Sequence, residues 1–307
     1  MLAARSSAPR PVAALAPSSH ASPPTLKMKS PSPASLVVFT GFTGLAVAPG
    51  DIHPILAAVA VLCIALASGA AGAINMWYDR DIDALMERTR DRPLPTGKIE
   101  PAEALSFGVI LAAGAIMLMF LATNAVAAVL LAAAVLFYVF VYTMWLKRRT
   151  PQNIVIGGAA GAFPPAIGWA AVTGDVGIEA IIMFLMIFCW TPPHFWALAL
   201  YREGDYVAAG VPMLPVVRGG AATKRQMLLY TLLLAPLSMA PCFLGIAGWP
   251  LYGSAAIVLN TIFLVLAVGV MRDTTEASAK RMFGFSIFYL FALFAVLIAD
   301  NSLSGML

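Results

Sequence analysis

An acidic stripe near residue 80 carries the strongest chemical signal in the sequence. Asn75, Asp79 and Asp83 follow one another at intervals of four residues, which places their side chains on one face of a helix. Such oxygen-bearing side chains suit Mg²⁺, a cation that shares its coordination shell with phosphate oxygens. Two carboxylates on one face repel each other without a counter-cation, although charges also simply terminate membrane spans. The stripe therefore predicts a Mg²⁺ site for a diphosphate, with Asp81 turned away from it.

Basic side chains that could hold the phosphates follow the stripe and recur at two later points of the chain. The candidates for contact with a diphosphate are Arg88, Arg92, Lys147, Arg148 and Arg202. Arginine forks bind phosphate oxygens in bidentate fashion. Each of these residues could instead anchor the chain at a membrane surface, and this second interpretation is the one we prefer for Arg149.

Two further polar features lie between residues 190 and 206. Glu203 and Asp205 could form a second acidic site, with Asp205 as an additional Mg²⁺ ligand. His194 is the only histidine well inside an apolar segment. Because a polar residue at that depth needs a partner, His194 could touch the iron or a propionate of a porphyrin, or bond to a neighbouring helix.

Small residues and prolines mark the apolar segment at 153–173. Gly157, Gly158 and Gly161 would let another helix, or a large planar ligand, approach the backbone closely. Pro164 and Pro165 predict a kink or a break in the helix, since proline lacks the amide hydrogen that the helix needs. Helix packing alone explains the glycines almost as well as a ligand does.

The elements that must position these residues are membrane-spanning helices. The chain has 307 residues, of which 61% are hydrophobic and 11% charged, and its mean hydropathy is +0.86. A soluble domain has no such composition, whereas a span needs about 20 apolar residues. We therefore predict an all-α, polytopic membrane protein of about nine transmembrane helices. The expected spans are about 34–50, 54–77, 104–122, 124–145, 153–173, 178–200, 226–247, 250–271 and 283–300.

The basic residues agree with this topology. With nine spans, all 19 Lys and Arg residues fall on one side of the membrane, which the positive-inside rule makes the cytoplasmic or matrix side. The N-terminus would then lie on the cytoplasmic side. The isoelectric point near 9.0 reflects the same bias, so it predicts the lipid bilayer as surroundings and no nucleic-acid partner.

Residues 1–33 differ from the rest of the chain because they are rich in Ala, Pro and Ser and contain no acidic residue. They predict a disordered cytoplasmic tail ahead of a transmembrane domain at 34–307. Acid-poor tails of this kind also resemble organelle transit peptides. The expected location is thus a bacterial inner membrane, with a mitochondrial inner membrane as the alternative.

Two connections are much longer than the others, at about 78–103 and 201–225. They are four predicted helices apart, so they emerge on the same face and would cap one common mouth. Each contains a proline-rich turn ahead of the next helix, at 92–97 and 212–220. This echo suggests a parallel repeat of four helices plus a ninth, an arrangement that places sites at the repeat interface.

Longer motifs give the sequence a family resemblance. The spacing Asn-x-x-x-Asp-x-x-x-Asp at 75–83 resembles the first motif of the UbiA superfamily of intramembrane prenyltransferases. Within that superfamily, the chain looks like the branch that farnesylates haem. The runs that carry this resemblance, in order, are 35–40, 86–95, 153–158, 191–199 and 205–215.

The resemblance implies a reaction and its participants. It implies transfer of a farnesyl group from farnesyl diphosphate to the vinyl group of haem B, with addition of water, giving haem O and diphosphate. Mg²⁺ would be the cofactor, held by Asn75, Asp79 and Asp83 with a contribution from Asp205. Haem A synthase or oxidase assembly factors would be expected protein partners.

Three rival interpretations remain open at this point. Another prenyltransferase of the same superfamily could act on a quinone precursor or a chlorin, against which the run at 191–199 argues. A secondary transporter could also use broken helices and repeats, but transporters usually place ionisable groups near the midplane, and here the charges cluster at one mouth. A non-catalytic assembly partner would not need intact Asp and Arg motifs.

Overall fold

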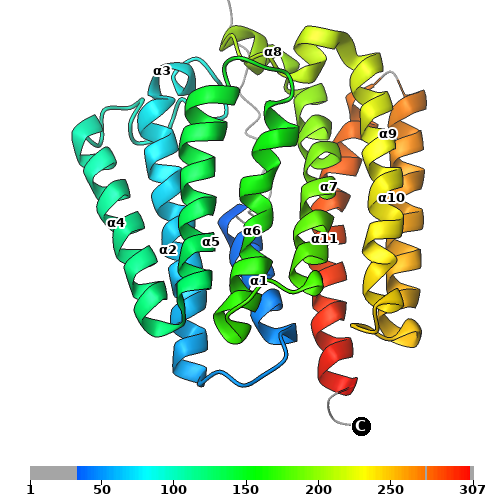
Figure 1. Ribbon diagram of the computed structural model, residues 1–307. Coiled ribbons are helices and arrows are strands. Elements are labelled where there is room, and N and C mark those ends of the chain that lie inside the picture. Colours follow the sequence, from blue (N-terminus) through cyan, green and yellow to red (C-terminus); the bar gives the residue numbers. More distant parts are fainter. Residues whose placement is uncertain (1–32, 274, 305–307) are drawn as a thin grey trace, which may run out of the picture. The chain divides into compact units, whose positions relative to one another are not determined.

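The protein is an all-helical bundle. The structure is a computed structural model that describes residues 33–273 and 275–304, among which every regular element is a helix. The tail predicted for residues 1–33, and its reading as a transit peptide, therefore lie outside the described residues except for Pro33. In chain order (Figure 1), the elements are α1 (Pro33–Val47), α2 (Pro54–Tyr78), α3 (Arg80–Asp83), α4 (Pro101–Ala122), α5 (Ala125–Leu136), η1 (Phe137–Leu146), α6 (Asn153–Thr173), α7 (Ile178–Tyr201), α8 (Glu203–Ala208), α9 (Leu214–Phe243), η2 (Trp249–Gly253), α10 (Ser254–Arg272) and α11 (Glu276–Ser304).

Eight of the described helical segments are long and apolar enough to cross a membrane: α2, α4, α5 with η1, α6, α7, α9, η2 with α10, and α11. They correspond to eight of the nine predicted spans, so the chain is a multi-pass membrane protein. The remaining predicted span is α1, whose 15 residues extend only about 22 Å. That is less than the roughly 30 Å of a hydrocarbon core. One of the nine predicted spans is therefore a helix too short to cross the core by itself.

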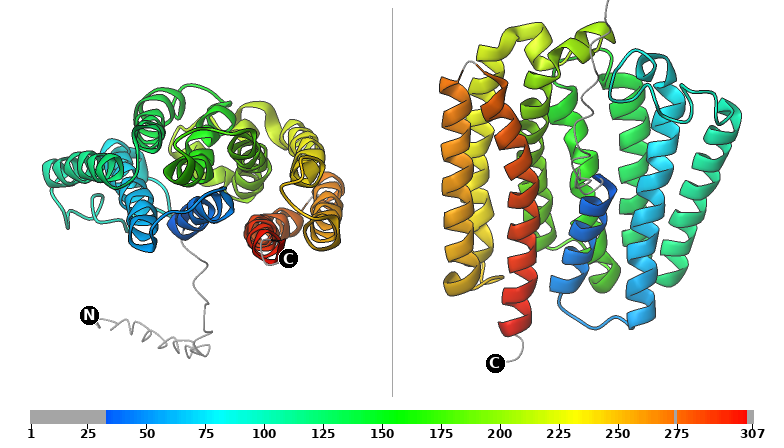
Figure 2. Two further views of the ribbon diagram at one scale, coloured as in Figure 1. Left: turned by 60° about the horizontal axis from the view of Figure 1, so that its bottom comes forward. Right: turned by 180° about the vertical axis from the view of Figure 1, so that it is seen from behind.

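Backbone contact holds α1 in the bundle although it is short. It packs between α2 and α11 and against α6 (Figure 2). A methyl group added to Gly44 would lie 1.9 Å from the carbonyl oxygen of Pro165, and one added to Gly168 would lie 2.0 Å from the oxygen of Gly41. Only glycine allows two helix backbones to approach this closely, so these positions determine where α1 lies.

The proline pair in α6 does not break the helix. Pro164 and Pro165 both lie inside a helix that runs from Asn153 to Thr173. Of the predicted kink or break, the break therefore does not occur, and the kink stays a prediction. A membrane helix tolerates internal proline where neighbouring helices cover the disturbed backbone. In this bundle the backbone of α1 covers it, at Gly41 and Gly44.

The helix α9 begins earlier than predicted. We expected a loop to about residue 225, but α9 starts at Leu214, with Pro215 in its first turn. Proline is favourable there because its missing amide hydrogen would have no partner. The predicted turn at Gly219 survives only as a kink, where φ is +77° and ψ is 166°, and the helix resumes at once.

Both long connections lie at one end of the bundle, which we call the mouth. The short helices α3 and α8 mark it in Figure 1. Each follows a long helix after a single residue, Asp79 or Arg202. Ile82 and Met86 of the first connection share an apolar cluster with Tyr206 of the second. The common mouth is thus confirmed, while the parallel repeat stays a prediction.

The last ten residues of the fourth span form a π-helix, η1, instead of the α-helix we expected. The amide of Lys147 accordingly bonds to the oxygen of Tyr142, five residues back, at 2.9 Å. This segment is pinned to the end of α2, because the hydroxyl of Tyr78 donates to the oxygen of Met144 at 3.3 Å. π-Helical turns occur frequently at functional sites, since they re-aim the side chains that follow.

A glycine contact positions η1 against α6. A methyl group added to Gly157 would lie 2.1 Å from the ring of Tyr142, so the predicted close approach at Gly157 is to a helix side chain. We expect Gly157→Ala to lower the free energy of unfolding by about 1–3 kcal/mol, through overpacking. Thermal unfolding in detergent measures this. Gly161→Ala is the matched control, because nothing lies within 4 Å of its added methyl group; equal stability of the two variants would contradict the packing argument.

Candidate functional site

The acidic stripe keeps its helical spacing where α2 ends. The amide of Asp79 bonds to the oxygen of Asn75 at 2.9 Å, and the amide of Asp83 bonds to the oxygen of Asp79 at 2.8 Å. The four-residue pattern therefore continues through Asp79 into α3. All three side chains are buried: Asn75 is 7% exposed, Asp79 0% and Asp83 2%. The structure thus brings the predicted stripe together at the mouth.

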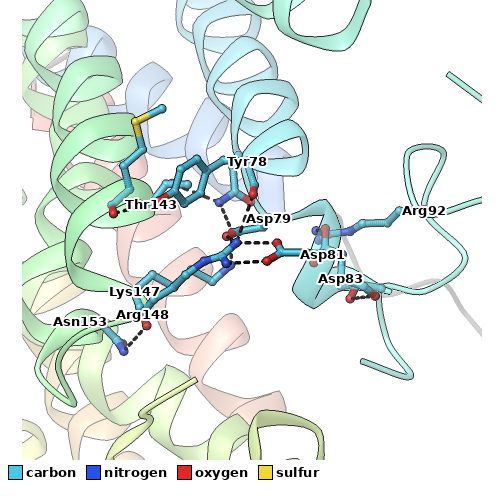
Figure 3. A network of polar contacts seen from close by, with 12 residues as sticks. Tyr78, Asp79, Asp81, Asp83, Arg92, Thr143, Lys147, Arg148 and Asn153 are labelled. Carbon is cyan, nitrogen blue, oxygen red and sulfur yellow. Dashed lines mark hydrogen bonds and ion pairs between the residues drawn. The ribbon is translucent and has the colours of Figure 1, made fainter. Parts of the chain in front are cut away.

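Asp79 is the hub of the polar network in Figure 3. One of its carboxylate oxygens, Oδ2, accepts a hydrogen bond from Asn75 Nδ2 at 2.8 Å and another from Lys147 Nζ. The other, Oδ1, accepts from Arg148 Nη2 at 3.2 Å. Asn75 Nδ2 also donates to Thr143 on η1 at 3.1 Å. A buried charge needs such pairing, and here the pairing joins α2 to the end of η1.

Asp83 has a separate cationic partner. Arg92 Nη1 donates to Asp83 Oδ2 at 2.7 Å, with the arginine side chain 34% exposed and the carboxylate 3% exposed. The hydroxyl of Thr89 donates to the backbone oxygen of Asp83 at 2.9 Å. The connection after α3 therefore folds back over the stripe, and Arg92 lies where a phosphate next to Asp83 would meet it.

Asp81 lies off the stripe, as its position in the sequence predicts. Its carboxylate accepts two hydrogen bonds from Arg148, at 2.7 and 2.6 Å. This guanidinium lowers the pKa of Asp81 to about 2, so the carboxylate is charged at any physiological pH. Arg148 also lies over the ring of Tyr78, 5.0 Å from its centroid. Asp81 is thus an exposed anchor that aims Arg148 at Asp79.

The second connection contributes Arg202 and Asp205. Arg202 Nη1 lies 3.2 Å from Glu87 and 3.8 Å from Asp205 Oδ2. That Asp205 oxygen is buried and has no hydrogen bond from any residue that the structure describes. Glu203 is exposed, and two positions along a helix point about 200° apart. Asp205 is therefore the acidic residue that faces inward, and a metal role for Glu203 and Asp205 together stays a prediction that this geometry does not favour.

The positive charge of Arg88, in the first long connection, acts on Tyr206 in the second. Burial raises the pKa of the Tyr206 phenol on α8, and the positive charge of Arg88 opposes that shift. Arg88 itself is exposed, and within the described part of the chain it enters no hydrogen bond or ion pair. Its guanidinium is therefore available at the mouth, which is consistent with the predicted phosphate contact.

His194 is bonded to a neighbouring helix. Its Nδ1 lies 2.6 Å from the hydroxyl of Ser286 on α11. Its ring stacks on Trp190 at 4.3 Å and on Phe283 at 4.7 Å, both measured between ring centroids. The sequence left two roles open for His194, and the bond to a neighbouring helix is the one that accounts for these contacts. Contact with a haem stays a prediction, for which only the edge of the ring remains.

Sequence reasoning missed three residues that support the site. Thr143 and Tyr78 tie η1 to α2, and Asn153, fully buried, donates from Nδ2 to the oxygen of Lys147 at 3.3 Å. A signal existed for Thr143, because it precedes Lys147 by four residues and so shares its face. Asn153 and Tyr78 act through contacts that cross between helices, which periodicity does not report.

The donor set suits Mg²⁺, although no ready cage is formed. Among the residues that the structure describes, no three His, Cys, Asp or Glu side chains are grouped so as to hold a metal ion. Asn75, Asp79 and Asp83 nevertheless supply the hard oxygen donors that Mg²⁺ prefers, and Mg²⁺ is usually held by one or two carboxylates together with phosphate. The metal set, with Asp205 added, stays a prediction.

The chain matches known proteins over most of its length. The model of the UbiA prenyltransferase family matches residues 37–295. A protein of Acidiphilium cryptum named protoheme IX farnesyltransferase is 58% identical over 285 residues, which are 90% of this chain and 90% of the relative. One of Parvibaculum lavamentivorans with the same name is 58% identical, over 90% of this chain and 88% of its own.

Solved structures share the fold. A digeranylgeranylglyceryl phosphate synthase superposes with a TM-score of 0.73 at 20% identity, covering 87% of this chain and 93% of its own. A UbiA homologue from Aeropyrum pernix superposes with a TM-score of 0.69 at 18% identity, covering 89% and 98%. One from Archaeoglobus fulgidus, bound to GPP and Mg²⁺, reaches 0.59 at 18% identity, covering 86% and 96%.

Proposed function

The chain belongs to the UbiA prenyltransferase family, and on that premise we propose that it transfers a farnesyl group from farnesyl diphosphate to the vinyl group of haem B, with addition of water, giving haem O and diphosphate. The observation that carries the proposal is the 58% identity, over nine-tenths of the chain, to relatives named for this activity. The buried stripe ringed by basic side chains supplies a matching diphosphate site.

The mouth residues would bind and stabilise the diphosphate. Bound Mg²⁺, held by Asn75, Asp79 and Asp83 with Asp205 nearby, would supply a Lewis acid that polarises the phosphate oxygens. The Mg²⁺ and GPP bound to the Archaeoglobus fulgidus homologue support metal-dependent binding of a prenyl diphosphate. Lys147, Arg148 and Arg92, now paired with the carboxylates, would turn to the phosphates, and with Arg88 and Arg202 would offset the negative charge that grows on the leaving group.

The apolar helices would guide the rest of the reaction. As the allylic C–O bond breaks, diphosphate leaves with the electron pair, and the vinyl carbon of haem B attacks the farnesyl cation to form a C–C bond. Water then captures the cation next to the macrocycle and loses a proton, which leaves a hydroxyl group. The bundle would hold the farnesyl chain away from bulk water, which would otherwise quench the cation before the vinyl group reaches it.

Location and partners follow from the same proposal. The relatives come from bacteria, which supports a bacterial inner membrane. The positive-inside rule places the basic mouth and the N-terminus on the cytoplasmic side, where a water-soluble diphosphate head group is released. Haem A synthase or oxidase assembly factors are proposed recipients of the product.

A turnover assay tests the reaction and its metal dependence. The purified protein in lipid receives haem B, farnesyl diphosphate and Mg²⁺, and mass spectrometry monitors farnesylated hydroxyethyl haem. We expect product, loss of product in EDTA, and recovery when excess Mg²⁺ is added. Quinone precursors and chlorins serve as alternative acceptors. Prenylation of one of those but not of haem would contradict the acceptor assignment, and undiminished turnover in EDTA would contradict the metal site.

A further inference from the structure

A pocket with two basic side chains in its lining lies outside the acidic stripe, at the mouth end of α9 and α10. Its volume is about 340 Å³, and it is lined by Gly220, Ala221, Lys224 and Arg225 of α9 together with Met271 from the last turn of α10. None of these residues takes part in the hydrogen bonds around Asp79. The pocket is therefore separate from the proposed catalytic site.

Local acidic groups neutralise the two cations of the pocket only in part. Asp273 accepts hydrogen bonds from the hydroxyls of Thr275 and Ser278 at 2.8 and 2.5 Å, and Glu276 is paired with Lys280 at 2.7 Å. Glu276 is thus compensated by Lys280, while Asp273 keeps one negative charge against the two positive charges of Lys224 and Arg225, so a net positive charge remains at the pocket.

The two cations themselves have free donors. Lys224 Nζ donates to the backbone oxygen of Asp273 at 2.5 Å, and an ammonium group keeps two further N–H bonds for another acceptor. Arg225 is exposed and has no hydrogen bond or ion pair with the described residues. The helix also restarts after the kink at Gly219, so the positive end of its dipole lies at Gly220 and Ala221.

The position of the pocket favours a lipid over a soluble anion. It lies where two spanning helices reach the end of the bundle, the level at which lipid head groups meet protein. Farther along the same helices, Leu229 is 53% exposed, Leu232 48% and Val265 64%. A cationic pocket next to an apolar flank matches a phosphate head group and an acyl chain in the same molecule.

We propose that this pocket binds the phosphate of an anionic phospholipid from the surrounding leaflet. Lys224 and Arg225 contact the phosphate oxygens, and an acyl chain lies along the exposed apolar side chains of α9 and α10. The bound lipid fills the groove between the two helices at the mouth, independently of farnesyl diphosphate.

Native mass spectrometry of the full chain tests the site. Wild type and Arg225→Gln are titrated with phosphatidylglycerol and, separately, with phosphatidylcholine. We expect one phosphatidylglycerol to bind more tightly than phosphatidylcholine, and Arg225→Gln to weaken it about fivefold, the effect of one basic residue at a membrane surface. Arg281→Gln removes the same charge from α11, outside the pocket, and should leave the affinity unchanged.

Two further outcomes decide the identity of the ligand. Lys224→Gln should also weaken phosphatidylglycerol, and the unfolding temperature without lipid shows whether the lost contact to Asp273 disturbs the fold. Inorganic phosphate at millimolar concentration is the competing probe. The lipid proposal would be overturned if inorganic phosphate displaced phosphatidylglycerol completely and also bound to the wild-type protein in the absence of lipid. The site would then be one for soluble phosphate. Equal loss in Arg225→Gln and Arg281→Gln would also overturn it.

Discussion

Replacing Asp79 or Asp83 by alanine is expected to reduce turnover at least about a thousandfold, while the protein still inserts into the membrane. Each carboxylate is buried and is a proposed Mg²⁺ ligand, and each is paired with a cation that we propose turns to the diphosphate. Loss of a single preorganised electrostatic group costs about 10²–10³ in rate, and loss of a metal ligand adds to this. Steady-state turnover with haem B and farnesyl diphosphate measures the effect.

Two controls separate chemistry from folding. Asp79→Asn keeps the shape of the side chain but removes its charge, and it should be as inactive as the alanine variant. Removing one partner of a buried ion pair can cost about 3–5 kcal/mol, so the unfolding temperature must be compared as well. Asp81→Asn removes a carboxylate that is 61% exposed and off the stripe, and it should keep turnover within a few fold. Near-normal turnover of Asp79→Ala or Asp83→Ala would contradict the mechanism.

Lys147→Gln is expected to lower turnover by a factor of about 10²–10³. Its unfolding temperature should fall less than that of Asp79→Ala. The side chain of Lys147 is 17% exposed and bonds to Asp79, the central carboxylate. It is therefore the cation best placed to stabilise the negative charge that grows on the diphosphate as it leaves. The loss should appear mainly in kcat, because the charge that it offsets grows as the C–O bond lengthens.

Arg149→Gln is the matched control for Lys147. Arg149 lies two residues farther along the chain, is exposed, and forms no side-chain hydrogen bond or ion pair with the described residues. Its removal also deletes one positive charge but should leave kcat unchanged. A second variant, Lys147→Arg, restores the charge with a different shape, and partial recovery is expected since arginine and lysine are not equivalent at a fitted site. Equal losses in Lys147→Gln and Arg149→Gln would mean that only net charge matters.

The periodicity of the sequence was enough to predict the bundle and the face of the acidic stripe. Residues four apart share a face whatever surrounds them, so Asn75, Asp79 and Asp83 align in the structure as expected. Long apolar runs likewise predict spans because the bilayer requires about 20 apolar residues. The common mouth of the two long connections followed from the same count of helices.

Only the tertiary structure decided which side chains contact the carboxylates of the stripe and His194. Lys147 reaches Asp79 from 68 positions away, and Ser286 reaches His194 from 92 positions away. Helix periodicity says which face a side chain occupies, but it does not say which helix that face will meet. The π-helical turn of η1 and the close contact of α1 with α6 depend in the same way on packing against neighbours, such as the ring of Tyr142 against Gly157. The sequence alone therefore determined the chemistry of the mouth and its place at the end of a span, while helix packing selected the partners that aim it.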